Sequence, residues 1–322
     1  MNSATIDSIS LQMQPFLDCE QMKRLREVLK CAITPIVDLS KHASQDLIDL
    51  FIEAKQVEGC SFKTLDYYRN TLERLNTALR KPFTQVETSD LRAYLTEYEQ
   101  KRNSSKVTID NIRRIMSSFF SWLEDEDYIV KSPVRRIHRV KVASVIKETF
   151  SDEELETIRG NSGSSRDLAI IDLLASTGMR IGELVRLNRS DINLNERECI
   201  VLGKGNKQRM VYFDARAKLH LSDYLGQRTD DNPALFVSHA RPHTRLTIGA
   251  IELRLRKLGE TLAIQRVHPH KFRRTLATYA IEKGMPIEQV QKLLGHARID
   301  TTMHYAMVNQ TNVKASHRRY LE

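Results

Sequence analysis

The sequence has no long hydrophobic run and no recognisable export signal. None of its 322 residues lie in a stretch of about 18 uncharged apolar residues, the length that a membrane span needs. The N-terminus lacks a basic segment followed by an apolar one. We therefore expect a cytoplasmic protein without a membrane partner. At 41% hydrophobic and 28% charged residues the chain is globular in composition, and its length suits two domains.

Cysteine is scarce, and its positions suggest no site. The four cysteines, at positions 19, 31, 60 and 199, have no CxxC spacing and no nearby pair of histidines, which argues against structural zinc and against a disulfide framework. His268 and His270 flank a proline, but no third ligand follows at a suitable spacing. We expect neither a metal ion nor a cofactor.

Positive charge is concentrated in the second half of the chain. Residues 1–150 hold 23 Lys and Arg against 21 Asp and Glu, whereas residues 151–322 hold 27 against 20. An excess of this kind favours a polyanionic partner, most readily nucleic acid. Many solvated surfaces are also basic, so the charge does not identify the partner by itself.

The first 130 residues predict an N-terminal extension followed by a helical bundle. The role of residues 1–40 is open, although Gln21 to Lys30 suits a basic amphipathic helix. In residues 41–130, apolar side chains recur every three or four positions in four segments, near 46–57, 62–79, 87–98 and 109–123. Four such helices joined by short loops form a compact bundle. We expect the single tryptophan, Trp122, in its core.

A basic segment separates this bundle from the rest. Residues 131–147 contain no acidic side chain, and Pro133 discourages a helix, so the segment is interpreted as a linker that lies along a phosphate backbone. Its candidate backbone contacts are Arg135, Arg136 and Arg139. Ser151 and Glu154 then form the sequence pattern of a capping box, which places the start of the second domain near residue 148.

Residues 148–322 mix helical and strand patterns. Helices are predicted near 168–176, 181–187, 248–262, 272–283 and 286–294. The apolar runs 199–202 and 210–213 are separated by GKGNKQR, the pattern of a β-hairpin with a glycine-containing loop. The fold class is therefore mainly α with a small antiparallel β-sheet, an α+β domain preceded by a helical bundle.

The last sixty residues carry the side chains that phosphodiester chemistry needs. A tyrosine phenol can hold a DNA phosphate covalently, so that a free hydroxyl can later reverse the cut. Two arginines can clamp the negative charge of the transition state, and a lysine or histidine can move the proton of the leaving oxygen. Such groups are present at His270, Arg273, His296 and Tyr305.

Five fragments occur in a specific order and spacing: TGMRIGEL at 177–184, GKGNKQR at 203–209, HKFR at 270–273, LGH at 294–296, and Tyr305 nine residues after His296. With them, residues 151–322 resemble the catalytic domain of the tyrosine recombinases, the phage-integrase type family. Residues 44–130 resemble the helical core-binding domain of that family.

The resemblance implies a role for each matching residue. Arg180 and Arg273 would clamp the phosphate, and Tyr305 would be the nucleophile that forms a 3′-phosphotyrosyl bond. The remaining implied roles are those of His270, which exchanges a proton with the nucleophile; His296, which hydrogen-bonds the scissile phosphate; Lys204, which acts as general acid toward the 5′ hydroxyl; and Glu183, which supports the first arginine.

Several positions leave alternatives open. Lys207 and Arg209 compete with Lys204 for the hairpin role, but Lys204 lies between the two glycines, and the other two are interpreted as contacts to backbone phosphate. Tyr320 is a rival hydroxyl outside the LGH spacing. Arg274 stands where many family members have histidine, and whether it too contacts phosphate is open.

The resemblance implies a site-specific DNA recombinase, active as a tetramer on paired double-stranded sites in the nucleoid, with room for an accessory DNA-bending protein. The tail 306–322 would pack on a neighbouring protomer, although its apolar spacing equally fits packing in cis. A mobile-element integrase is preferred because of the N-terminal extension and Arg274. The alternatives are a Xer-type resolvase of chromosome or plasmid dimers, an inactive DNA-binding architectural protein, and a DNA-relaxing activity like that of type IB topoisomerases.

Overall fold

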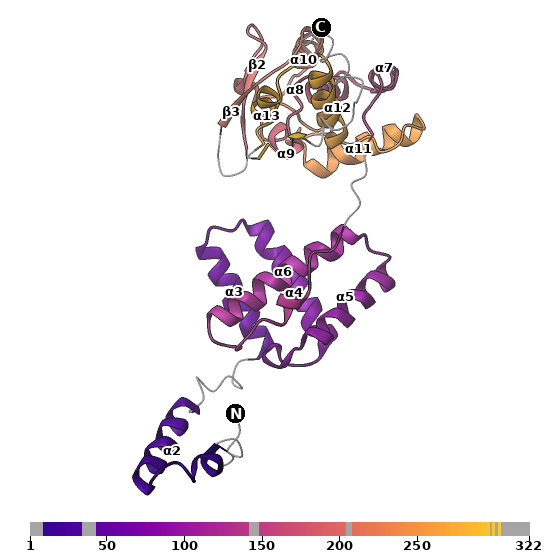
Figure 1. Ribbon diagram of the computed structural model, residues 1–322. Helices are drawn as coiled ribbons and strands as arrows, with labels where there is room; N and C mark the ends of the chain where they lie inside the picture. Colours follow the sequence, from indigo (N-terminus) through magenta and orange to yellow (C-terminus); the bar gives the residue numbers. More distant parts are fainter. Residues whose placement is uncertain are drawn as a thin grey trace, which may run out of the picture. The chain divides into compact units, whose positions relative to one another are not determined.

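The computed structural model describes residues 9–33, 43–141, 148–203, 208–296, 298–299 and 302–303, and the side chains of 29–33 are not among the described parts. The chain divides into two compact units, Met1–Ser144 and Val145–Glu322 (Figure 1). The predicted tail packing of residues 306–322 lies outside the described residues. Among the described residues, no helix is long and apolar enough to cross a membrane.

Helix α2 (Cys19–Ile33) precedes the predicted bundle in the first unit. The bundle itself consists of α3 (Ser44–Val57), α4 (Phe62–Leu79), α5 (Thr88–Arg102) and α6 (Lys106–Asp125), with a short 3₁₀ turn, η2 (Phe83–Gln85). Ser61 and Ser105 begin α4 and α6 by accepting a hydrogen bond from a backbone N–H in the first turn. Phe51 and Phe119 lie in the core, and Trp122, which was expected there, is partly buried and packs against both rings.

The start of the basic segment differs from a linker. Its first part forms a 3₁₀ turn, η3 (Pro133–Arg136), and Val134 is buried in the bundle core, with Ile137 and Val140 packed against that core. The Thr88 hydroxyl donates to the carbonyl of Pro133 at 2.7 Å. Apolar residues at a spacing of three supply this packing between the arginines, and it extends the bundle to about residue 140. Residues 142–147 lie outside the described residues.

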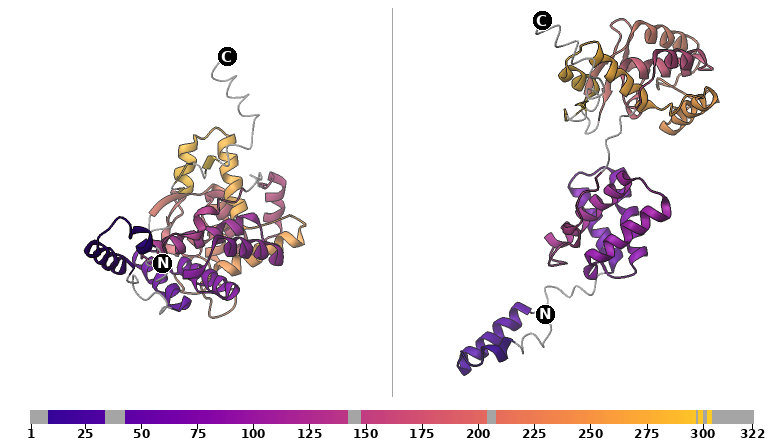
Figure 2. Two further views of the ribbon diagram at one scale, coloured as in Figure 1. Left: turned by 60° about the horizontal axis from the view of Figure 1, so that its bottom comes forward. Right: turned by 45° about the vertical axis from the view of Figure 1, so that its right-hand side comes forward.

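The second unit is mainly helical with one small antiparallel sheet, which confirms the predicted fold class. Its elements are α7 (Asp152–Gly160), α8 (Ser165–Thr177), α9 (Ile181–Leu184), η4 (Arg189–Asp191), β1 (Ile192–Asn193), β2 (Glu198–Leu202), β3 (Gln208–Tyr212), α10 (Ala215–Gly226), α11 (Ile248–Thr261), α12 (Pro269–Glu282) and α13 (Ile287–Leu294). The strand order is β1-β2-β3, and Val201 of β2 pairs with Arg209 of β3. Helices α12 and α13 lie side by side near the yellow end of the colour scale (Figure 2).

Three elements of this unit, η4, β1 and α10, were not predicted from the sequence. Strand β1 has only two residues, too few for a strand pattern to show. Helix α10 buries Ala217, Leu221 and Tyr224 at helical spacing and is capped by Asp214, so its signal was present and was missed. Helix α12 also begins at Pro269, earlier than predicted, which places His270 in its first turn.

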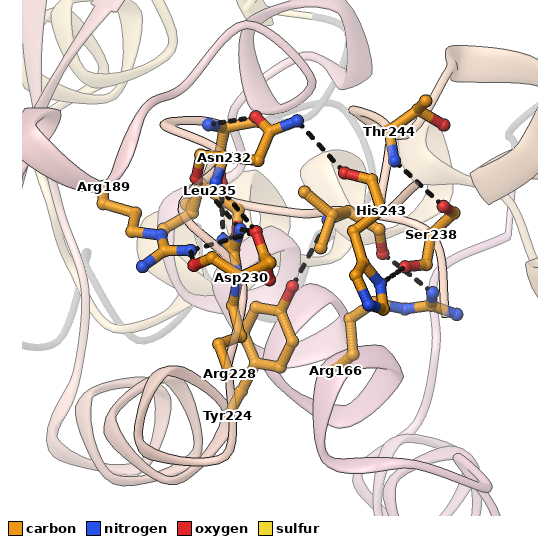
Figure 3. A network of polar contacts seen from close by, with 12 residues as sticks. Arg166, Arg189, Tyr224, Arg228, Asp230, Asn232, Leu235, Ser238, His243 and Thr244 are labelled. Carbon is orange, nitrogen blue, oxygen red and sulfur yellow. Dashed lines mark hydrogen bonds and ion pairs between the residues drawn. The ribbon is translucent and has the colours of Figure 1, made fainter. Parts of the chain in front are cut away.

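Residues 228–247 connect α10 to α11 without a helix or a regular strand, and arginine side chains hold this segment in place (Figure 3). Arg228 donates to the carboxylate of Asp230 and to the carbonyls of Ala234 and Leu235. Arg166 of α8 donates to the carbonyl of Val237 at 2.9 Å. Buried backbone carbonyls need donors, and these guanidinium groups supply them where a sheet would otherwise do so.

Candidate catalytic site

Two arginines from distant parts of the sequence meet at the C-terminal end of α13. Arg273 is only 3% exposed and donates to the carbonyl of Leu294 at 2.6 Å and to that of Gly178 at 2.7 Å. Arg180 donates to the carbonyl of Gly295, the next residue, at 3.2 Å. The two guanidinium groups therefore bind adjacent carbonyls, directly before His296.

Local structure places Arg180 at this point. Helix α8 ends at Gly178, whose φ of 59° lies in the left-handed region that favours glycine. A Cβ atom at Gly178 would also lie 2.7 Å from a methyl carbon of Leu276. The chain then turns, and Arg180 becomes the N-cap of α9, with its backbone N–H bonded to the Glu183 carboxylate at 2.8 Å.

Glu183 is the acidic centre of the site. It is 4% exposed, and its carboxylate accepts from the Arg180 guanidinium at 2.9 Å and from both terminal nitrogens of Arg209 at 2.7 Å. Burial alone would raise the pKa of the Glu183 carboxyl, but the hydrogen bonds from Arg209 and from the Arg180 backbone, together with the Arg209 charge, lower that pKa below its ordinary value. Glu183 is therefore ionised at neutral pH.

The pKa values of the two predicted catalytic histidines, His270 and His296, are both lowered by burial and by the same arginines. Burial lowers the pKa of His296 to about 4, and the charges of Arg273, Arg180 and Arg209 act in the same direction. Burial is also the main reason why the pKa of His270 is lowered, and the charges of Arg273 and Arg180 add to it. Both imidazoles are accordingly neutral near pH 7 and can accept a proton or a hydrogen bond.

The described structure brings together four of the six predicted catalytic residues: Arg180, His270, Arg273 and His296. The other two, Lys204 and Tyr305, lie outside the described residues, as does Lys207. Within the described ranges, no group of three or more His, Cys, Asp or Glu residues is arranged to hold a metal ion.

The predicted backbone-contact residues have varied surroundings. In the first unit, Arg135 pairs with Glu124 at 2.7 Å, and Arg136 and Arg139 are exposed. In the second unit, Arg274 donates to the carbonyl of Glu148 at 2.6 Å. Arg209 is only 13% exposed and is directed at Glu183, which differs from the expected contact with phosphate.

Sequence reasoning missed two residues that hold His296. Thr302 is fully buried, and its hydroxyl lies 2.9 Å from Nδ1 of His296. Gln291 of α13 donates to the carbonyl of His296 at 3.0 Å. The threonine stands six residues after the histidine and carried no pattern of its own, so only the folded chain reveals the contact.

Comparison with known proteins shows which family the chain resembles. Residues 146–312 match the phage integrase family, and residues 47–129 match the phage integrase N-terminal SAM-like domain. A tyrosine recombinase XerC of Oceanobacillus iheyensis is 32% identical over 292 residues, which cover 84% of this chain and 94% of the relative.

Two solved structures are similar in fold. One is a XerH site-specific recombinase bound to palindromic difH substrate, with a TM-score of 0.68 and 20% identity over 87% of this chain and 85% of that one. The other is the Tn1549 transposon integrase in complex with circular intermediate DNA, with a TM-score of 0.69 and 17% identity over 86% of this chain and 99% of that one. The family match, the XerC relative and the converging arginines lead to one conclusion: the chain belongs to the phage integrase family of tyrosine recombinases, enzymes that cut and rejoin DNA strands.

Proposed function

We propose that this tyrosine recombinase exchanges strands between two double-stranded DNA sites, with Tyr305 as its nucleophile. The observation that carries the proposal is the convergence of Arg180 and Arg273 on the carbonyls of residues 294 and 295. These carbonyls directly precede His296, and Tyr305 follows nine residues later in the sequence. Two guanidinium groups at one point suit a phosphate whose negative charge grows during the reaction.

The proposed reaction conserves the phosphodiester bond energy. The Tyr305 oxygen forms a bond to phosphorus as the bond from phosphorus to the 5′ oxygen breaks. His270 accepts the proton of the phenol, and Lys204 donates a proton to the departing 5′ oxygen. Attack by a 5′ hydroxyl on the phosphotyrosyl bond reverses each step and releases the tyrosine.

The electrostatics of the described residues support these roles. A histidine can accept the phenol proton only when it is neutral, and the lowered pKa of His270 keeps it so near pH 7. His296, with a pKa of about 4, is neutral as well and hydrogen-bonds the scissile phosphate in this proposal. The positive charge that meets the phosphate then comes from the arginines.

A nicked suicide substrate tests the proposal. The short fragment that carries the 5′ hydroxyl dissociates after cleavage, so the reaction cannot reverse and the covalent adduct accumulates. The wild-type protein should form the adduct on its own site, and Tyr305→Phe should abolish it. Tyr320→Phe is the matched control, since it removes the other C-terminal hydroxyl and should leave adduct formation intact. DNA binding without any adduct from the wild type would instead indicate an inactive DNA-binding protein.

The biological role that we propose is integration of a mobile element by a tetramer on two dissimilar sites. The extension before the matched region and Arg274 in place of histidine support this role. The Xer-type resolvase is the second candidate, favoured by similarity to XerC along 84% of the chain. Mapping covalent adducts across the host chromosome separates them, because a resolvase uses two copies of one site and an integrase joins unlike sites.

DNA contacts outside the cut site complete the proposal. We assign backbone phosphate contacts to Arg135, Arg136, Arg139, Lys207 and Arg274, and further DNA binding to the bundle of residues 41–130. Each lost phosphate contact should reduce the slope of log affinity against log salt by about 0.9. Adding a DNA-bending protein to the strand-exchange assay tests for an accessory partner in the nucleoid.

A further inference from the structure

We infer that Arg209 is a positioning residue for Arg180 and acts through Glu183, in place of the phosphate contact that its position in the hairpin suggests. The inference deepens the proposed function, on which its catalytic part rests. Arg209 comes from β3, whereas Arg180 and Glu183 come from the start of α9. These two segments meet only because the sheet packs beside α9.

The contacts of Arg209 engage all three nitrogens of its guanidinium group. Its two terminal nitrogens each donate to a different oxygen of Glu183 at 2.7 Å, and Nε donates to the carbonyl of Leu293 at 3.3 Å. This parallel, two-bond pairing is the geometry that arginine offers and lysine cannot. Arg209 makes short bonds to a buried carboxylate, so its charge is offset by Glu183 and is not available to a phosphate.

The charges show what the pairing does for Arg180. Glu183 carries one negative charge and is bonded to two guanidinium groups, so the three side chains together keep one positive charge. Arg209 is the more buried partner and makes the shorter bonds, while Arg180 is 37% exposed. Without Arg209, Arg180 would become the sole counter-ion of Glu183, and its charge would no longer be available to a phosphate.

Arg209 also reaches the segment that carries His296. A Cβ atom at Gly295 would lie 2.9 Å from Cδ and 3.0 Å from Nε of Arg209, and Gly295 has a φ of 64°. The Gly295 carbonyl is the one that Arg180 binds. Arg209 therefore packs between the residue before His296 and the carboxylate that holds Arg180, and it fixes both at once.

Two substitutions of Arg209 distinguish positioning from phosphate contact. Arg209→Ala should slow adduct formation at saturating DNA at least 30-fold, with the dissociation constant for DNA and its salt slope nearly unchanged. Arg209→Lys keeps the charge but loses the two parallel bonds, so it should remain slow. If Arg209→Ala instead raises the dissociation constant for DNA and reduces its salt slope, and Arg209→Lys restores both, then Arg209 contacts phosphate. That result would overturn the inference.

A double-mutant cycle tests whether Arg209 acts through Glu183. In the Glu183→Gln background, Arg209→Ala should slow adduct formation less than threefold further. If the two substitutions instead reduced the rate of adduct formation independently, so that their factors multiplied in the double variant, the inference would be contradicted. The same four proteins are also compared by their urea midpoints without DNA, and the shifts of the two single variants should not add. If Arg209→Ala does not fold, Arg209→Lys takes its place in both cycles.

The urea cycle separates this inference from the proposed function. If the wild type forms no adduct but the midpoint shifts are coupled, the recombinase proposal fails, whereas the pairing that holds Arg180 stands. If the wild type forms the adduct and both cycles are additive, the recombinase proposal stands and the positioning role of Arg209 is wrong.

Discussion

Arg273 donates a hydrogen bond of 2.6 Å to the carbonyl of Leu294, the last residue of α13. Its second terminal nitrogen donates to Gly178, the residue that ends α8. The last carbonyls of a helix have no partner within the helix, and a positive charge there also complements the helix dipole. One buried guanidinium group thus joins two helix ends, and the proposed phosphate clamp is part of the packing of the unit.

Replacement of Arg273 should therefore affect both stability and reaction. Arg273→Lys leaves at least one buried carbonyl without its donor, so we expect the free energy of unfolding to fall by about 2 kcal/mol. Adduct formation should fall at least 100-fold at temperatures where the variant is folded. Urea unfolding and the suicide-substrate assay measure the two effects. Arg274→Lys, at the adjacent and less buried position, is the control for stability, and an equal loss in both variants would contradict the argument.

The bend between α8 and α9 makes a second prediction. Gly178→Ala forces a side chain into a left-handed conformation and into contact with Leu276, so the free energy of unfolding should fall by about 1 to 3 kcal/mol. Gly249→Ala is the control, because Gly249 lies in α11 and a Cβ atom there would meet nothing within 4 Å. It should change stability by less than about 1 kcal/mol. Thermal or urea unfolding of both variants decides the point.

Part of the candidate catalytic site could be predicted because the residues that position it form short local sequence patterns. TGMRIGEL contains both the glycine that ends α8 and the arginine that caps α9, so the local turn and Arg180 could be predicted together. The capping box of Ser151 and Glu154, which was predicted, likewise marks where α7 begins. Such features depend on neighbours within about four residues, which a single sequence shows directly.

Features that depend on distant contacts could not be predicted. Arg209 was interpreted as a contact to backbone phosphate because its partner, Glu183, is brought beside it only by the packing of the sheet. The segment 131–147 was interpreted as a linker because its positive charge concealed three apolar residues, Val134, Ile137 and Val140, that pack on the bundle. In both cases the sequence showed the positive charge of the side chains but not the residues that they contact in the folded chain.

A buried aspartate away from the catalytic site gives a third prediction. Asp172 of α8 is 1% exposed and pairs with Arg159 of α7 at 2.6 Å and with the imidazole of His220 on α10. Asp172→Asn removes the buried counter-ion of Arg159 and leaves it only Glu156, which is 58% exposed, so we expect the free energy of unfolding to fall by about 2 kcal/mol. Asp231→Asn, on the exposed connection after α10, should change it by less than about 0.5 kcal/mol. Similar losses in both variants would show that the contact between these three helices contributes little.

The lowered pKa of His296 makes the stability of the protein depend on pH in a defined direction. In the unfolded chain an imidazole ionises near pH 6.5, whereas folded His296 stays neutral down to about pH 4. Between these values the unfolded state binds a proton that the folded state does not, so stability is full above pH 6.5 and falls as the pH is lowered. We expect His296 to contribute a loss of about 1 kcal/mol per pH unit in this window, since partial solvent exposure reduces the limit of about 1.4 kcal/mol.

His296→Gln should flatten the slope of the unfolding free energy against pH between pH 6 and pH 5. The slope that remains should include the contribution of His270, whose pKa is lowered in the same direction. At pH 8 both imidazoles are neutral in either state, so a difference between the variant and the wild type there measures only the lost packing and the contact with Thr302. An unchanged slope in the variant would mean that His296 takes up its proton as readily in the folded protein as in the unfolded chain, which would contradict the burial of its ring beside the arginines.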